Sequence, residues 1–275
     1  SLDSHVSALM MDNKGVTKKV LERAGISVPG GYEYTSPEAG MADYRLYAGK
    51  PVVIKPKSTN FGLGITILKH NYDETDFKAA LQIAFEHDNT VLIEKFIPGR
   101  EFRIFIINDE VVGILHRVPA NVTGDGVLNI GQLIDMKNED PLRGKGYRTP
   151  LEKIRKGREE EMFLKQQGMD FNTVPKEGEV VYLRENSNIS TGGDSIDFTD
   201  DIDDSYKAIA VEAAKALNVK ITGLDMMIQD IHAPATPDNY AIIEMNFNPA
   251  IHIHCYPFKG KNRHLNHKMI KALGF

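Results

Sequence analysis

The sequence predicts an α+β fold. Residues 203–217 carry apolar side chains at helical spacing, which indicates an amphipathic helix. Residues 101–107 instead place successive side chains on alternating faces, as a β-strand does. The pair Asn108-Asp109 then supplies a hairpin turn into a strand at 111–118, so we expect these strands to be antiparallel.

A break at Pro98-Gly99 predicts two lobes. It follows an apolar strand at 91–96 and precedes the strand that begins at Glu101. We therefore expect a smaller first lobe over residues 1–98 and a larger second lobe over residues 99–275.

The remaining elements follow from the same two periodicities. Further helices are expected at 14–24 with Gly25 as the stop, at 43–48, at 73–87 with Asp73 as the N-cap, and at 151–167, which Gly168 ends. Further strands are expected at 51–56, 64–69, 222–229 and 240–246. The segment 119–150 is rich in Gly, Asn, Asp and Arg, and we expect it to form loops.

Composition narrows the class of protein. The 275 residues have a net charge of -5, which provides no basic surface for nucleic acid or anionic membranes, and we expect neither as a partner. No apolar run approaches the roughly 20 residues that span a bilayer. The N-terminus lacks the regions of a signal peptide, and the one cysteine, Cys255, has no partner for a disulfide within the chain. We therefore expect a cytoplasmic protein.

Lys55 is a candidate phosphate-binding residue. It follows Val52-Val53-Ile54 on an apolar strand, where a cation can hold phosphate oxygens by charge-assisted hydrogen bonds. The alternative is a lysine that snorkels at a strand end. The loop after the strand contains Gly62 and Gly64, which can let backbone N–H groups approach phosphate, although such glycine pairs are often simple turns.

Two acidic residues, Glu94 and Glu101, bracket the break between the lobes. A purine needs an apolar slot with backbone hydrogen bonds, and vicinal hydroxyl groups suit a carboxylate acceptor. The alternative is that Glu94 and Lys95 form an exposed ion pair of little energetic value.

Asp225, Glu244 and Asn246 form a candidate metal site. Glu244 and Asn246 are two residues apart and so share one face of their strand. Two carboxylates and an amide oxygen from paired strands suit Mg²⁺ held jointly with phosphates. The alternative is a pair of salt-bridged acids, but apolar neighbours make uncompensated charges costly here.

In their order and spacing, these groups resemble the ATP-grasp superfamily of carboxylate–amine ligases. The resemblance implies two lobes with antiparallel sheets and packed helices that grip ATP between them. It places Glu94, Lys95 and Ile97 at the adenine and Glu101 at the ribose.

The same resemblance implies ATP and Mg²⁺ as cofactors, with two ions, and Mn²⁺ as the alternative metal. It makes Asp225, Glu244 and Asn246 the metal ligands. Lys14, which opens the first helix, corresponds to a second phosphate-binding lysine, and Lys18 or Lys19 on that helix is a less attractive choice.

Three further segments, 116–126, 138–144 and 183–193, narrow the resemblance to one branch of the superfamily. This branch contains cyanophycin synthetase and the fused bacterial glutathione synthetase, and the likeness runs from about residue 9 to 270. Within this branch, the sequence most resembles the ATP-grasp module of the bifunctional glutamate–cysteine ligase/glutathione synthetase. We expect the chain to be such a module, released from an N-terminal glutamate–cysteine ligase domain.

The implied reaction is an ADP-forming ligation. ATP phosphorylates the carboxylate of γ-glutamylcysteine to an acyl phosphate, and glycine attacks it with release of phosphate. Arg117 and Arg184 are candidates for gripping the carboxylate or acyl phosphate, and Asn188 is grouped with them as catalytic. Some dipeptide ligases of the superfamily carry an arginine where this chain has Gly223, so the cation for the acyl phosphate must come from elsewhere.

Two other functions stay open at this point. One is a cyanophycin-synthetase-like amino acid ligase, and the other is a nucleotide-binding module without catalysis. A zinc site at Cys255 is not expected, because His252 and His254 share a predicted strand face without the usual paired spacing. These residues are expected to shape the end of the substrate pocket.

Overall fold

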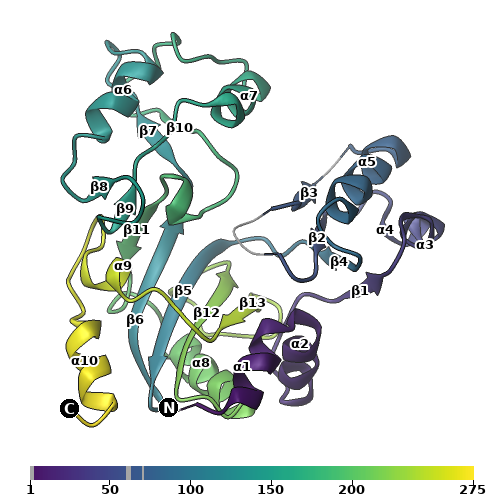
Figure 1. Cartoon of the computed structure of the whole chain (residues 1–275). Coiled ribbons are helices and arrows are strands. Elements are labelled where there is room, and N and C mark those ends of the chain that lie inside the picture. The colour runs from purple at the N-terminus through teal and green to yellow at the C-terminus, as the bar shows by residue number, and fades with distance from the viewer. Residues whose placement is uncertain (1–2, 60–62, 70) are drawn as a thin grey trace. The chain divides into compact units, whose positions relative to one another are not determined.

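The structure is a computed structural model, which describes residues 3–59, 63–69 and 71–275 (Figure 1). Its α-helices are α1 (His5–Asp12), α2 (Lys14–Arg23), α3 (Pro37–Ala42), α4 (Tyr44–Tyr47), α5 (Glu74–Phe85), α6 (Ile130–Lys137), α7 (Arg158–Gln166), α8 (Asp204–Ala216), α9 (His252–Cys255) and α10 (Leu265–Ala272), with a 3₁₀-helix η1 (Ile189–Thr191). Its strands are β1 (Gly31–Tyr34), β2 (Val52–Pro56), β3 (Thr66–Leu68), β4 (Val91–Lys95), β5 (Arg100–Ile107), β6 (Glu110–Val118), β7 (Asn121–Thr123), β8 (Arg143–Gly144), β9 (Leu151–Glu152), β10 (Val180–Tyr182), β11 (Asp194–Asp197), β12 (Ile221–Ile228) and β13 (Tyr240–Asn246).

The chain divides into two compact units. Unit 1 comprises Ser1–Arg100, Ile104–Val111 and Asp201–Pro249. Unit 2 comprises Glu101–Arg103, Val112–Asp200 and Ala250–Phe275. The predicted boundary between two lobes at Pro98-Gly99 remains a prediction.

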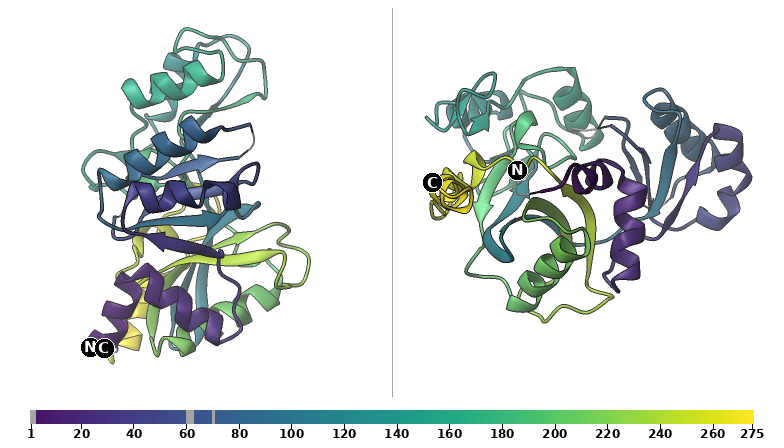
Figure 2. Two further views of the ribbon diagram at one scale, coloured as in Figure 1. Left: turned by 90° about the vertical axis from the view of Figure 1, so that its right-hand side faces the viewer. Right: turned by 60° about the horizontal axis from the view of Figure 1, so that its bottom comes forward.

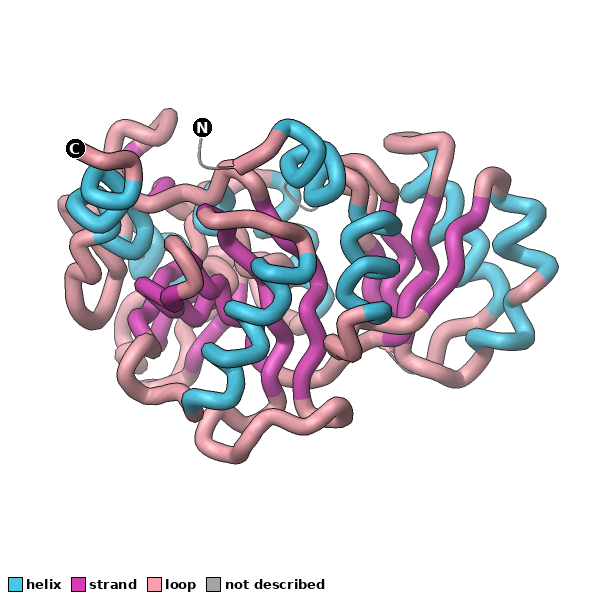
Figure 3. Tube along the Cα trace, turned by 90° about the horizontal axis from the view of Figure 1, so that it is seen from below, coloured by secondary structure: helices cyan, strands magenta, loops and turns pink. Residues whose placement is uncertain are grey.

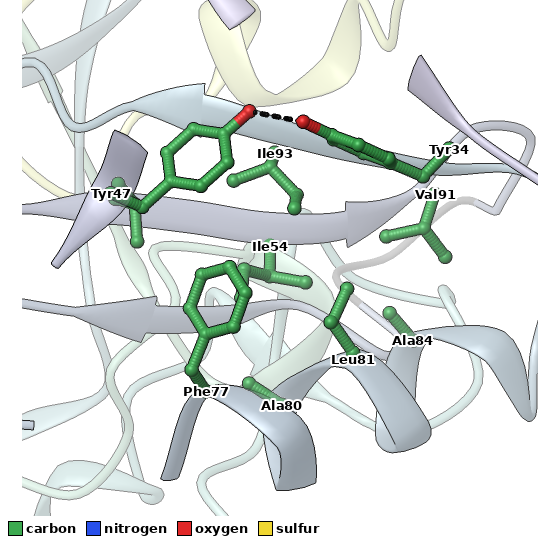
Figure 4. Packing of buried hydrophobic residues seen from close by; sticks show 10 residues of the cluster. Tyr34, Tyr47, Ile54, Phe77, Ala80, Leu81, Ala84, Val91 and Ile93 are labelled. Atoms are coloured by element: carbon green, nitrogen blue, oxygen red, sulfur yellow. Dashed lines mark hydrogen bonds between the residues drawn. The ribbon is translucent and has the colours of Figure 1, made fainter. Parts of the chain in front are cut away.

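Unit 1 contains a four-stranded antiparallel sheet with the order β1-β4-β2-β3. Helices α3 and α5 pack against it, and the strands and these helices are seen side by side in Figure 3. The core between them is rich in aromatic side chains (Figure 4). The Phe77 ring is fully buried and stacks on Tyr47 with 5.7 Å between the ring centroids, and the hydroxyl groups of Tyr34 and Tyr47 are 2.8 Å apart.

The β12–β13 hairpin is the other main part of unit 1. Its strands are antiparallel, and they end the five-stranded order β11-β6-β5-β12-β13. Helices α1 and α2 lie side by side and both contact β13 (Figure 2). The Tyr206 ring of α8 meets Tyr240 of β13 edge to face at 6.3 Å between centroids. Lys14 of α2 is close enough to Glu244 of β13 to feel its charge.

Several sequence predictions are confirmed in detail. Asp73 caps α5 in a capping box with Asp76, because each side chain accepts from the backbone N–H of the other. Asn108 and Asp109 turn the β5–β6 hairpin with φ of 49° and 65°, the left-handed conformation that such two-residue turns require. The helices near 14–24 and 203–217 and the predicted strand pair 222–229 and 240–246 are present as α2, α8, β12 and β13.

Unit 2 corrects two predictions. The segment 119–150 is not only loop, because it contains helix α6, which Asn129 and Gln132 close with a capping box. The helix predicted from residue 151 begins at Arg158 instead, with Gly157 at its N-cap. The preceding Leu151 is fully buried in strand β9, so its apolar character reflects a strand and not an earlier helical turn.

None of the helices described in the structure combines the length and the apolar character that would be needed to cross a membrane.

Candidate functional site

Lys55 and Glu94 form a buried ion pair in unit 1. They lie on the neighbouring strands β2 and β4, with 2.8 Å between Lys55 Nζ and Glu94 Oε2. Lys55 is 6% exposed and Glu94 is 2% exposed. The two alternatives considered from sequence, a snorkelling Lys55 and an exposed Glu94–Lys95 pair, are therefore wrong. The pKa of Glu94 is held below its usual range, because Lys55 and Lys18 outweigh the effect of burial, which would raise it.

Lys14 is the first residue of helix α2, which contacts strand β13. Its Nζ donates to the Thr59 carbonyl oxygen at 2.8 Å. Burial lowers the pKa of the Lys14 ammonium, and the field of Glu244 raises it, whereas that of Lys55 lowers it further. Lys14 is thus close enough to feel both the phosphate-binding candidate Lys55 and the metal-ligand candidate Glu244.

Asp225 and Glu244 face each other on the β12–β13 ladder, and Gly223 faces Asn246. Because facing and alternate residues of a sheet share one side, the three predicted metal ligands lie on the same face of the hairpin. Asp225 is 4% exposed. Two carboxylates directly opposite each other repel, so the arrangement is favourable only when a cation lies nearby.

The residues present fit a divalent ion held with phosphates. Carboxylate and amide oxygens are the donors that Mg²⁺ prefers. The Nδ2 atom of Asn246 is buried and has no hydrogen-bond partner within the described part of the chain, so this donor can serve a phosphate oxygen, whereas the Oδ1 atom would bind the ion. Over the same described residues, no three His, Cys, Asp or Glu side chains cluster as a metal site, and the predicted set consists of two carboxylates and one amide.

The glycine loop is described only in part. Gly62 lies outside the described residues. Gly64 has a φ of +73°, and a Cβ atom there would come within 2.7 Å of both Pro56 and His87. A side chain is therefore excluded at Gly64 by backbone conformation and by space.

The segment after β4 lines a hollow in unit 1. The Lys95 and Phe96 N–H groups donate to the carbonyl oxygens of Gly30 and Pro51. The Lys95 side chain is exposed. Lys95 and Ile97 line a pocket of about 730 Å³. Its other lining residues are Ser27, Val28, Gly30, Lys50, Pro51, Phe96, Pro98, Gln229, Pro237, Asp238, Tyr240 and Ala241.

In unit 2, Glu101 is held by two neighbours. Arg117 of β6 forms an ion pair with its carboxylate, and the Ser187 hydroxyl donates to Glu101 Oε2 at 2.6 Å. The predicted ribose acceptor and the predicted substrate arginine are therefore in direct contact.

The other two catalytic candidates are engaged within unit 2 as well. Arg184 bonds to Glu160 Oε1 at 2.6 Å and also pairs with Glu159. The Asn188 carbonyl oxygen accepts the N–H groups of Thr191 and Gly193, which closes the turn around η1. Their predicted roles toward substrate remain predictions.

Sequence reasoning missed two groups of charged residues. Lys18 binds Glu94, although the sequence analysis favoured Lys14 over it. One signal in the sequence could have indicated Lys18 as a site residue, since it lies four residues after Lys14 and so on the same face of the helix. In unit 2, Lys137 and Arg143 share the buried Asp194 and lie 5.2 and 5.5 Å from the centre of the Phe258 ring. Nothing in the local sequence of Lys137 indicates this contact.

The interpretation of the His-rich segment was wrong in one respect. His252 and His254 belong to the short helix α9, not to a strand. Burial lowers the pKa of His254 to about 3, so it is neutral at physiological pH.

Comparisons with known proteins show what this chain is similar to. Residues 33–132 match the family model described as the D-ala D-ala ligase C-terminus. The chain is 61% identical to a glutathione biosynthesis bifunctional protein GshAB of Desulfotalea psychrophila over 275 residues, which are 100% of this chain and 35% of that protein. A protein of the same name from Clostridium perfringens is 55% identical, with 99% of this chain and 35% of that protein covered.

Solved structures show the same relationship. A bifunctional glutathione synthetase from Pasteurella multocida superimposes with a TM-score of 0.75 at 49% identity, covering 99% of this chain and 38% of that one. The D-alanine–D-alanine ligase from Bacillus anthracis reaches 0.54 at 20% identity, over 89% of this chain and 59% of that one, and so shares the fold. The predicted ATP-grasp fold and the predicted resemblance are confirmed, and the chain spans about 35% of the length of the curated relatives it matches.

Proposed function

We propose that this chain, which has the ATP-grasp fold and resembles the ATP-grasp part of bifunctional glutathione biosynthesis proteins along its whole length, is an ADP-forming ligase that joins γ-glutamylcysteine to glycine. One observation carries the ligase function. Lys14 feels the charges of both Lys55 and Glu244 and belongs to helix α2, which contacts strand β13, so we assign the phosphate-binding cations and the metal-binding acids to one site in unit 1. The names of the relatives support the choice of substrates.

Unit 1 binds the reacting end of ATP in this proposal. The ammonium groups of Lys14 and Lys55 hold phosphate oxygens by charge-assisted hydrogen bonds. Asp225, Glu244 and Asn246 would hold two Mg²⁺ ions, or Mn²⁺, whose charge offsets that of the phosphates during transfer. The backbone of Gly64 approaches the phosphates without a side chain in the way.

The nucleoside is assigned to the segment that joins the two predicted lobes. Lys95 and Ile97 offer backbone hydrogen-bonding groups beside an apolar surface for adenine, and Glu94 belongs to the same end of the site. Glu101 accepts from the ribose hydroxyl groups. Its carboxylate is already oriented by Arg117 and Ser187, which supports a fixed acceptor position.

The peptide carboxylate attacks the γ-phosphorus of ATP, which forms the acyl phosphate and releases ADP. The amine of glycine then attacks the acyl carbon, the new amide bond forms, and phosphate leaves. Arg117, Arg184 and Asn188 are proposed to bind the carboxylate and then the acyl phosphate. This requires that the substrate anion compete with Glu101 for Arg117, and with Glu159 and Glu160 for Arg184.

A glutamate–cysteine ligase domain is the proposed partner, since it would supply γ-glutamylcysteine. The word "bifunctional" in the names of the relatives supports a second activity in those proteins. A cytoplasmic site of action is proposed as well, because the lone Cys255 is a buried free thiol.

The test is the identity of the product. The chain is incubated with Mg·ATP, γ-glutamylcysteine and one amine at a time, and the products are identified by mass spectrometry. The amines are glycine, alanine, arginine, aspartate and lysine. Glutathione with glycine, and little product with the other amines, supports the proposal. A parallel incubation replaces γ-glutamylcysteine with an aspartate-containing peptide. Product only there, with arginine or aspartate as the amine, would support the cyanophycin-synthetase-like alternative instead.

A further inference from the structure

Lys18 is a lysine of α2 that the proposed reaction does not use. Its side chain is 13% exposed, and its Nζ lies 2.6 Å from Glu94 Oε1. Burial lowers the pKa of the Lys18 ammonium, and Glu94 acts in the opposite direction by its charge and its hydrogen bond. A lysine in this environment gives up hydration and rotamer freedom, so the contact with Glu94 must offset that cost.

The Glu94 carboxylate divides its two oxygens between two lysines. Oε1 receives Lys18 at 2.6 Å and Oε2 receives Lys55 at 2.8 Å. With both oxygens bound, the plane of the carboxylate is fixed, and the direction from which Lys55 is held is fixed with it. Lys18 therefore acts on Lys55 without touching it.

We propose that Lys18 is a positioning residue for the nucleotide, which holds Glu94 so that Glu94 in turn presents the Lys55 ammonium to the phosphates of ATP. The inference rests on the proposed function, since Lys55 is assigned to phosphate there. It goes beyond the proposed function, which assigns Lys14 and Lys55 to phosphate but gives no role to Lys18.

The excess of positive charge around Glu94 supports a role of Lys18 in nucleotide binding rather than only in anchoring helix α2. Lys14, Lys18 and Lys55 lie near one another, since Lys55 lowers the pKa of both other lysines, and Glu94 is the carboxylate that pairs with two of them. Anchoring is achieved by other contacts of the same helix. Leu21 is 1% exposed, and the Thr17 hydroxyl donates to the Met10 carbonyl oxygen at 2.7 Å.

The first experiment measures the affinity for Mg·ATP by calorimetry, without peptide or amine. Lys18→Met should weaken binding about tenfold, because one charge-assisted contact in the chain of contacts is lost. Lys18→Arg keeps the charge and should recover most of the affinity. The matched control is Lys19→Met, which removes an exposed lysine from the next position of the same helix and should stay within about twofold of wild type.

A double-mutant cycle separates positioning from direct contact. If Lys18 acts through Glu94, then adding Lys18→Met to Glu94→Gln should change Mg·ATP affinity by less than about twofold. A tenfold loss in both backgrounds would show that Lys18 acts on the nucleotide by itself and would overturn the inference. Equal affinity of wild type and Lys18→Met would overturn it as well, and melting temperatures of all variants identify any that fail to fold, in which case Lys18→Arg and Glu94→Gln carry the comparison.

The test of Lys18 and the test of the proposed function can fail independently. A wild-type chain that binds Mg·ATP but makes no product with γ-glutamylcysteine would refute the proposed substrates, while the Lys18 comparison still decides the inference. A wild-type chain that does not bind Mg·ATP would refute both.

Discussion

Asp225 and Glu244 face each other directly on antiparallel strands, at the last pair before the β12–β13 register shifts. Like charges at such a position destabilise a hairpin unless a cation offsets them. Lys14, whose ammonium feels the field of Glu244, offsets part of this charge from helix α2. A function that needs two carboxylates on one face explains why Asp225 and Glu244 are paired, and metal-assisted phosphoryl transfer is such a function.

The first prediction concerns these acids. Asp225→Asn and Glu244→Gln each remove a negative charge with little change in side-chain volume, so the fold should persist. Turnover should fall by at least about a hundredfold, because loss of one such electrostatic contact typically costs about 3–4 kcal/mol in the transition state. ADP release at saturating Mg·ATP and thermal unfolding measure the two effects.

The matched control for that prediction is Glu212→Gln, at an exposed position of helix α8. It should leave turnover unchanged. Near wild-type turnover of the Asp225 and Glu244 variants at limiting Mg²⁺ would remove these residues from the metal site.

The second prediction concerns Lys55. Lys55→Ala removes a phosphate contact and also leaves Glu94 with one lysine, so the affinity for Mg·ATP should fall by at least about tenfold. Lys69→Ala, at an exposed position just beyond β3, should bind Mg·ATP like wild type. If calorimetry gives the same affinity for both variants, Lys55 does not bind the nucleotide.

The third prediction concerns the core of the first sheet. Phe77 is fully buried among Tyr44, Tyr47 and Tyr72. Phe77→Ala should lower the free energy of unfolding by about 3–5 kcal/mol, from lost burial and from the cavity left behind. Phe275→Ala, at a side chain that is 90% exposed, should change it by less than about 0.5 kcal/mol. Equal denaturation midpoints would contradict the packing in Figure 4.

The fourth prediction is a pH dependence in unit 2. Burial would raise the pKa of Asp197, but Arg263 and Thr199 hold it below its ordinary value of 3.8. Arg263 Nε donates to Asp197 Oδ2 at 2.9 Å, and the Asp197 side chain is 3% exposed. Because the folded-state pKa is depressed, the stabilisation is fully present above the ordinary pKa and is lost as the pH falls through the depressed value.

Asp197→Asn should therefore destabilise the protein by about 2 kcal/mol at neutral pH. Its difference from wild type should shrink as the pH falls below 3.8. Asp201→Asn, at an exposed acid, is the control and should follow wild type throughout. Urea unfolding between neutral and acid pH measures the difference, and a gap that stays constant with pH would show that the ionised carboxylate is not the cause.

Local signals in the sequence were sufficient for much of the fold. Asp73 and Asp76 close a capping box within four residues, and Asn108-Asp109 form a turn whose geometry depends only on themselves. The shared face of Glu244 and Asn246 follows from strand periodicity alone. The partner on the next strand does not, because register is set by pairing, and the structure supplies it as the facing pair Asp225 and Glu244.

The remaining features depend on contacts between distant residues. Lys18 and Glu94 are 76 positions apart, so helical spacing could place Lys18 on the face of Lys14 but could not identify Glu94 as its partner. Leu151 and the residues of α6 were misassigned for a related reason. Short apolar runs serve strands and helices equally well, and burial in the core of unit 2 decides between them.

The central claim is tested most directly by ADP release from the wild-type chain with Mg·ATP and with γ-glutamylcysteine and glycine supplied separately and together. The account predicts ADP and glutathione in equal amounts when both substrates are present, and no glutathione when either is omitted. It predicts neither product from Asp225→Asn. Binding of Mg·ATP without any ADP release in the presence of both substrates would contradict the ligase function.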